Sequence, residues 1–162
     1  MNTSLFSAGN LAFKRDLVNQ GEQAAATALE LFRTGVLKDS GSDGTSLPAS
    51  NYSAVQLDTN ARGIPLALLS NSAYDAKATA KISRPTDQIE VRYVIDRLCN
   101  AAGAASKSNC VYAPAITDVR GGDISGAERP PPPNALVFRL SVRVDGPRQT
   151  QVFLQSSFTK PE

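Results

Sequence analysis

The first part of the chain, residues 5–34, is a long amphipathic segment that limits the fold more than any other stretch. Apolar or small residues recur at steps of three, four or seven, which places them on one face of a helix. About 30 helical residues span roughly 45 Å, so the helix must cross the whole domain or continue upstream. The residues expected to face the core are Phe6, Phe13, Leu17, Gly21, Ala24, Ala28, Leu31 and Phe32.

The composition is that of an ordinary folded domain. With 162 residues, 41% of them hydrophobic and 20% charged, the chain is expected to form one domain with a real core. The formal net charge of +2 is too small to indicate a nucleic-acid or membrane partner. No apolar run approaches the ~18 residues of a transmembrane helix, and no secretory signal is visible.

Histidine is absent from the chain. Its absence removes every Ser-His or Cys-His nucleophile pair and every histidine-ligated zinc site. Two cysteines cannot form a tetrathiolate site, and no pattern in the sequence assembles carboxylate pairs or a lysine centre. We therefore expect a protein without enzymatic activity, cofactor or bound metal.

The two cysteines, Cys99 and Cys110, are separated by ten small or polar residues, NAAGAASKSN. A loop of this kind is flexible enough to let the sulfurs meet, and a bridge would stabilise the fold by about 2–3 kcal/mol. The alternative is two unpaired thiols, one of them buried. We favour the disulfide because the intervening segment has no other evident means of being ordered, and a disulfide indicates an oxidising compartment.

Residues 36–87 are expected to form a loop-rich crossing segment. Gly35 is predicted to end the helix in a left-handed conformation, and glycine, serine and aspartate then describe a solvated loop. Residues 52–57 are expected to be a short extended piece. In the apolar stretch 64–69, Pro65 is expected to open a short helix or turn that packs against the long helix. Residues 70–80 are expected to be coil, with a helical turn as the alternative.

The pattern changes from helical to alternating in the second half. Residues 88–98, 136–144 and 151–158 each alternate apolar and polar side chains, which is typical of half-buried strands. The outward arginines of these strands are not interleaved with aromatic residues, as a nucleic-acid platform usually requires. We therefore expect a solvated sheet face that carries Arg92, Arg139 and Arg143.

The last two strands are expected to form a hairpin around a turn at residues 145–148. Pairing Leu140 with Leu154, and Val142 with Val152, keeps their apolar faces together. Phe153 then faces away from the main core, as a contact with a partner or as an exposed aromatic side chain.

Together these elements predict an α+β fold: a long N-terminal amphipathic helix packed on a C-terminal antiparallel sheet of about four strands. The expected divisions are the helix at 1–35, the crossing segment at 36–87, and the sheet at 88–162. The last part also contains the disulfide loop and a proline-rich connector. Since neither the disulfide loop nor residues 121–133 has an evident core role, we expect them to form a partner surface. Its candidate residues are Ala104, Ser106, Lys107, Gly122, Asp123, Pro131 and Pro132.

This order of elements resembles the type IV pilin fold. Residues 7–29, SAGNLAFKRDLVNQGEQAAATAL, resemble the segment that follows the membrane-spanning part of PilX-type minor pilins. Residues 91–99, VRYVIDRLC, are similar to the first strand of that family. Residues 138–158, FRLSVRVDGPRQTQVFLQSSF, resemble its closing hairpin with the Gly-Pro-Arg turn.

The resemblance implies an inner-membrane-anchored minor pilin with a periplasmic domain. Such a protein primes pilus assembly, lies at or near the tip of the extracellular fibre, and supports twitching motility and cell adhesion. Its implied partners are other minor pilins, with a large tip adhesin as a further candidate. The nearest alternative is a minor pseudopilin of type II secretion, and the other is a secreted adhesin or ligand-binding module.

Two features depart from the pilin pattern. A pilin begins with a processing site, a methylated residue and an apolar helix half, whereas this chain starts at Met1-Asn2-Thr3-Ser4; we expect an engineered truncation. The cysteine pair encloses a loop before the final hairpin, whereas many major pilins carry their bridge near the C-terminus.

Overall fold

The computed structural model describes residues 2–39, 41–77, 82–84, 88–113 and 135–161. Short 3₁₀ turns occur at Ser42–Gly44, Pro48–Ser50, Leu66–Leu68 and Pro147–Gln149. The helices and strands are α1 (Asn2–Arg33), β1 (Tyr52–Ser53), α2 (Asn71–Lys77), β2 (Ile82–Arg84), β3 (Ile89–Arg97), β4 (Tyr112–Ala113), β5 (Ala135–Asp145) and β6 (Gln151–Pro161).

The described strands form one mostly antiparallel sheet, and the protein is an α+β fold. Three long strands, β3, β5 and β6, lie side by side in antiparallel pairs and account for the three alternating segments of the sequence. The short β2 and β4 pair antiparallel with β3 and β5, and β1 pairs parallel with β3. The sheet thus has six described strands, where about four were expected. The additional strands are too short to show an alternating pattern.

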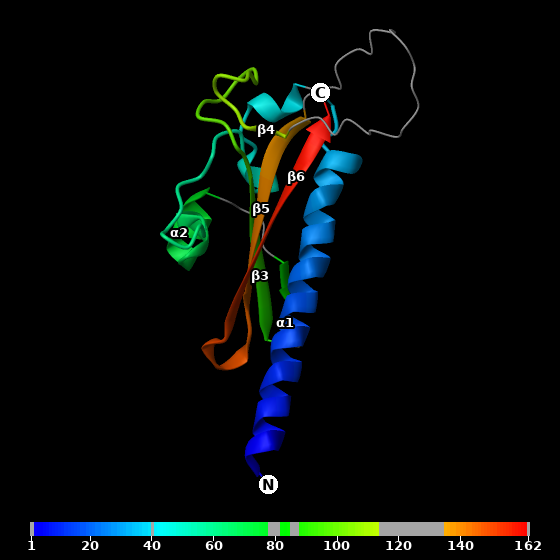
Figure 1. The fold of residues 1–162 in the computed structure, drawn as a ribbon, viewed down its shortest axis with the longest axis vertical. Coiled ribbons are helices and arrows are strands. Elements are labelled where there is room, and N and C mark those ends of the chain that lie inside the picture. Colours follow the sequence, from blue (N-terminus) through cyan, green and yellow to red (C-terminus); the bar gives the residue numbers. More distant parts are fainter. Residues whose placement is uncertain (1, 40, 78–81, 85–87, 114–134, 162) are drawn as a thin grey trace, which may run out of the picture.

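Helix α1 packs along one face of this sheet and forms most of the core with it (Figure 1). Leu17, Ala24 and Ala28 are buried, with at most 4% of their surface exposed. Phe13 and Leu31 are half-buried beside this core. The expected core residue Phe6 lies in the first turns, where side chains are not described.

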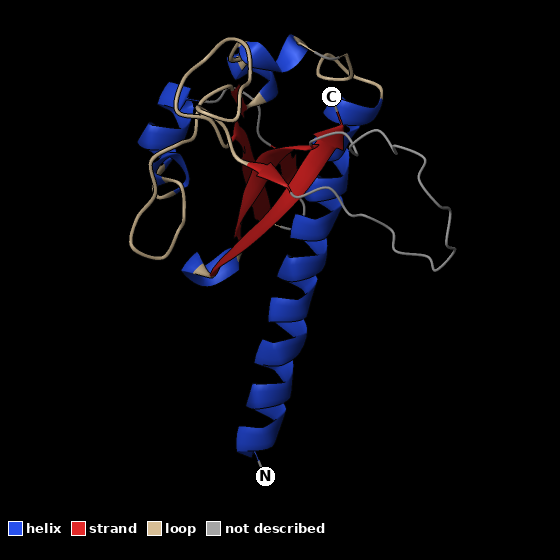
Figure 2. Cartoon of the chain, turned by 45° about the horizontal axis from the view of Figure 1, so that its top comes forward, coloured by secondary structure: helices blue, strands red, loops and turns tan. Residues whose placement is uncertain are grey.

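The first turns of α1 extend beyond the sheet (Figure 2). A side chain built at Gly9 would meet no atom within 4 Å, and Leu11 is 60% exposed. Among the described helices, none has both the length and the hydropathy needed to span a membrane.

The middle of α1 fits against the sheet through Gly21. A Cβ atom at Gly21 would lie 2.1 Å from Leu154 Cδ1, so any larger residue would displace the β6 side chain. Gly35, in contrast, is not in the left-handed region, and that prediction is wrong. The helix ends at Arg33, and the Gly35 N–H donates to the Glu30 carbonyl oxygen at 3.0 Å.

An aromatic cluster joins the upper end of α1 to the sheet. The Phe32 ring lies 5.0 Å from that of Phe138 and 4.9 Å from that of Phe158, both in edge-on arrangements. The Tyr52 ring approaches Phe32 at 6.1 Å. Edge-on aromatic pairs add about 0.5–1.5 kcal/mol each to the stabilisation by burial, so this cluster fixes where the helix meets β5 and β6.

The β5–β6 hairpin has a different register from the predicted one. Val142 lies opposite Leu154 and Val144 opposite Val152, a shift of two residues that leaves each side chain on its expected face. The loop also begins and ends later than the expected turn at residues 145–148, because Asp145 still pairs with Gln151. Residues 146–150 form it, closed by the Gly146 N–H donating to the Thr150 carbonyl oxygen at 2.8 Å.

A second, smaller apolar cluster lies on the sheet face away from α1. Leu68, Tyr74 and Val94 are its buried members, and Phe153 packs against them half-buried. The predicted packing of residues 64–69 against the long helix is therefore wrong. Phe153 faces away from the main core as predicted, but it is half-buried against this second cluster and not simply exposed. Pro65 directly precedes the 3₁₀ turn Leu66–Leu68, and α2 forms where coil was favoured.

Candidate interaction surface

The disulfide loop is an ordered projection at the end of β3. Cys99 and Cys110 form the predicted bridge, with an S–S distance of 2.04 Å. The two chain segments also pair through their backbones, since the Asn100 N–H donates to the Asn109 carbonyl oxygen at 2.7 Å. Cys99 is buried and Cys110 half-buried, so the bridge anchors the loop to the core.

The tip of this loop is held by Asn109. Its Oδ1 accepts from the Ser106 N–H at 2.8 Å, and its Nδ2 donates to the Ala104 carbonyl oxygen at 3.3 Å. Ala104, Ser106 and Lys107 are all exposed on this turn. The structure thus brings these three expected partner-surface residues together. The other four lie outside the described residues: Gly122, Asp123, Pro131 and Pro132.

Arg97, which the sequence analysis missed, orders the base of the loop. Its side chain is fully buried. Nη2 donates to the carbonyl oxygens of Ala101 and Gly103 at 3.2 and 2.9 Å, and Nε donates to that of Ala54 at 3.0 Å. Nη1 lies 3.9 Å from Asp43 Oδ1. The one feature of the sequence that could have indicated this role is the position of Arg97, on the side of β3 that otherwise carries apolar residues.

The predicted solvated arginine face is wrong. Arg92, Arg139 and Arg143 are only 3%, 8% and 6% exposed. Residues 54–77 cross this face of the sheet and cover it, while the alternation of β3 and β5 correctly placed the three side chains on it. Arg143 Nη1, for example, donates to the Leu68 carbonyl oxygen in the covering segment at 3.0 Å.

Each buried arginine of this face has a carboxylate partner. Arg92 Nη1 and Arg143 Nε both donate to Asp145, at 2.7 and 2.9 Å. Arg139 makes a two-pronged pair with Asp96, through Nε to Oδ1 at 2.9 Å and through Nη2 to Oδ2. Burial raises the pKa of the Asp96 carboxyl, and the bonds from Arg139 and from the Leu57 N–H partly offset this effect.

Two buried tyrosines connect residues 43–77 to the sheet. The Tyr74 hydroxyl accepts from Asn51 Nδ2 at 3.0 Å and donates to the Tyr93 carbonyl oxygen at 3.3 Å. Burial raises the pKa of Tyr74 to about 12, from the ordinary value of 10.0. Burial also raises the pKa of Tyr52, whose hydroxyl donates to the Asp43 carbonyl oxygen at 2.6 Å.

We expect the protein to lose stability between pH 10 and about 12. A folded-state pKa above the unfolded value means that the unfolded chain releases the Tyr74 proton first, so stability falls as pH rises through this window. Tyr74 alone should account for about 2–3 kcal/mol of this loss. Urea unfolding of the parent and of Tyr74→Phe at several pH values measures it. A difference between the two that does not change with pH would contradict it.

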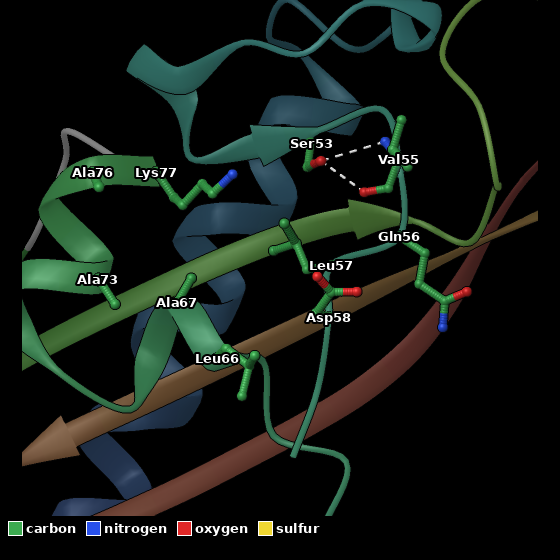
Figure 3. Close-up of a pocket in the computed structure, with 10 residues that line it drawn as sticks. All are labelled: Ser53, Val55, Gln56, Leu57, Asp58, Leu66, Ala67, Ala73, Ala76 and Lys77. Atoms are coloured by element: carbon green, nitrogen blue, oxygen red, sulfur yellow. Dashed lines mark hydrogen bonds between the residues drawn. The ribbon is translucent and has the colours of Figure 1, made fainter.

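A cavity of about 440 Å³ opens between residues 53–58, the Leu66–Leu68 turn and α2 (Figure 3). Its charged lining residues are Asp58 and Lys77. The Ser53 hydroxyl is engaged with its own turn, donating to the Val55 carbonyl oxygen at 2.6 Å. Among the described residues, no three histidine, cysteine, aspartate or glutamate side chains gather where they could hold a metal ion. Among the described residues that line the cavity, none form a pair of nucleophile and base.

No family model, curated protein or solved structure matches this chain. The family resemblance therefore rests on the three sequence segments 7–29, 91–99 and 138–158. The fold contributes only the coarse class, a helix on a mostly antiparallel sheet.

Proposed function

We propose that this chain is the globular part of a minor pilin that takes part in the initiation of type IV pilus assembly and in the pilus tip complex. The observation that carries the proposal is the division of α1 into two parts. Residues from Phe13 onward contribute to the core with the sheet, whereas a side chain at Gly9 would meet no atom within 4 Å and Leu11 is 60% exposed. A helix extending this far beyond its own core is suited to packing among other subunits.

The remaining support comes from the sequence and from the disulfide. The three segments that resemble PilX-type minor pilins lie in α1, in β3 and in the β5–β6 hairpin, which are the elements of the main core. A bridge between Cys99 and Cys110 suits a domain in the periplasm or outside the cell. An apolar segment preceding α1 would anchor the protein in the inner membrane before it enters the fibre.

The proposed role works through interfaces and needs no catalytic residue. The free turns of α1 would contact neighbouring minor pilins. The ordered tip of the disulfide loop, with Ala104, Ser106 and Lys107 exposed, would contact a second subunit or a large tip adhesin. Arg97 and the disulfide hold this tip in one conformation, which lowers the entropy lost on binding.

Deleting the gene is expected to reduce surface pili strongly in a strain sensitised by loss of other assembly factors. Electron microscopy of sheared pili measures this, and the parent gene should restore the wild-type number. Complementation with Lys107→Glu should restore fewer pili than complementation with Lys77→Glu, a matched change at an exposed lysine away from the loop.

Two results would contradict the proposal. Normal piliation of the sensitised deletion strain would exclude an assembly role, and a secretion defect with normal pili would instead indicate a type II pseudopilin. The native 5′ end of the gene gives an independent check, because a pilin requires a cleavable leader and an apolar helix before Ser4.

A further inference from the structure

Strand β6 is an edge of the sheet. All of its residues, Gln151–Pro161, pair with β5 in eleven consecutive pairs, and no described strand pairs with its other side. In Figure 1 the upper part of β6 lies between β5 and the upper part of α1. Its Leu154 and Phe158 are half-buried, whereas the corresponding apolar residues of β5 are fully buried.

In the β5–β6 hairpin, every second residue of β6 forms backbone hydrogen bonds with β5. This alternation identifies the backbone groups of β6 that point away from β5. The Gly146 N–H donates to the Thr150 carbonyl oxygen, so that pair is hydrogen-bonded and Asp145–Gln151 is not. Bonded and non-bonded pairs alternate along an antiparallel ladder. The N–H and C=O groups that point outward from the sheet therefore belong to Gln151, Phe153, Gln155, Ser157 and Thr159.

This edge lacks the features that usually prevent strand pairing. Natural edge strands carry charged side chains, prolines or bulges. The register of β6 is continuous, and no charged residue or proline occurs between Gln151 and Thr159. Its one charge, Lys160, is turned back onto the chain, where Nζ donates to the carbonyl oxygens of Leu37 and Asp39 at 2.7 Å each.

A groove lies next to the edge, between β6 and α1. It has a volume of about 390 Å³, and small or apolar residues such as Ala25, Leu29 and Leu154 line it. Among the described residues that line it, Glu22 alone is charged. If another strand paired with β6, every second side chain of that strand would point to the face that α1 covers. Such a side chain would enter this groove.

We infer that the β6 edge binds an extended segment of another protein by strand addition. The segment carries small apolar side chains at alternate positions, which fill the groove, and a lysine or arginine that pairs with Glu22. A second copy of this chain fits less well, because its own β6 has no charged residue between Gln151 and Thr159 that could pair with Glu22, and its Lys160 is bound to the chain itself. The inference depends on the described edge and groove alone and is independent of the pilus proposal.

Peptides of alternating valine and threonine with one terminal lysine or glutamate test the inference. Nuclear magnetic resonance of the isotope-labelled protein follows the binding. We expect the lysine peptide to bind more tightly and to slow hydrogen exchange of the Phe153, Gln155 and Ser157 amides by about tenfold or more. Glu22→Lys should reverse the preference, so that the glutamate peptide binds more tightly.

The variant Ser157→Pro tests whether the peptide binds at the β6 edge, because it should weaken binding there without destabilising the fold. The Ser157 N–H points outward, so proline removes an edge donor without breaking a bond to β5. Ser157→Thr keeps the donor and is the matched control. The proline variant should keep the parent urea midpoint within error but bind the lysine peptide about tenfold more weakly or worse.

Three outcomes would overturn the inference. The first is the absence of peptide binding, and the second is binding that Ser157→Pro leaves unchanged or that Glu22→Lys does not reverse. The third is a concentration-dependent dimer that the parent forms and Ser157→Pro does not, because a second copy would then be the occupant of the edge.

Discussion

Replacing Arg139 with methionine is expected to lower the free energy of unfolding by about 3–5 kcal/mol. Arg139 makes two bonds to Asp96 and a third to the Leu57 carbonyl oxygen, at 3.1 Å, beneath the covering segment. Asp96 is fully buried. Without the guanidinium, the Leu57 N–H, at 2.8 Å, is the one donor from another described residue that the Asp96 carboxylate keeps. A buried charge with so little compensation is the main source of the expected loss. Urea unfolding at neutral pH measures it.

The double variant Arg139→Met/Asp96→Leu provides the control for this prediction. It removes both charges and should recover most of the loss, because an apolar pair of similar volume often replaces a buried ion pair without cost. The deficit of the single variant should also shrink as pH falls, since protonation of Asp96 removes the buried charge. If the free energy of unfolding of Arg139→Met lay within about 1 kcal/mol of the parent value, the prediction would be wrong. The pair would then contribute as little as an exposed ion pair does.

The sequence predicted the elements whose signal is local and repeated. The spacing of Leu17, Ala24 and Ala28 specified both α1 and its buried face, as the structure has them. Alternation specified β3, β5 and β6 and the face to which each of their side chains points. Alternation requires that side chains on the same face lie opposite each other, but registers that differ by two residues satisfy this equally well. The hairpin register was therefore wrong by two residues, with Val142 opposite Leu154.

The covering of the arginine face could not be read from the strands. Alternation placed Arg139 and Arg143 opposite the apolar face but carries no information about what lies over them. The answer depends on residues 54–77, a loop-rich segment whose course is set by tertiary contacts such as the bond from Arg143 to the Leu68 carbonyl oxygen.

The candidate surfaces show the same limit. The cysteine spacing predicted the disulfide, but the order of its loop also depends on Arg97, whose partners are far apart in sequence. The β6 edge gave little signal, because Val152, Leu154 and Phe158 alternate as in a central strand. Only the order of strands in the sheet shows that one side of β6 is unpaired among the described residues.

Replacing Arg97 with methionine is expected to lower the free energy of unfolding by about 3–5 kcal/mol, because it leaves one buried and two partly buried carbonyl oxygens without their donor. The carbonyl oxygens of Ala54, Ala101 and Gly103 all accept from its side chain. The disulfide loop should lose stability more than the rest of the fold does. Hydrogen exchange of the Gly103 amide, which donates to the Gly44 carbonyl oxygen at 2.7 Å, should accelerate more than that of β5.

Arg33→Met is the matched control for this variant. The Arg33 side chain is 76% exposed and pairs only with Glu30, three residues earlier on α1. An exposed pair of this kind contributes about 0.5 kcal/mol or less, so the two substitutions share their chemistry and differ in burial. Equal losses in the two variants, or a Gly103 amide that exchanges as in the parent, would show that the disulfide alone orders the loop. The Arg97 result therefore decides whether the exposed tip is held by one covalent bond or by the sheet beneath it.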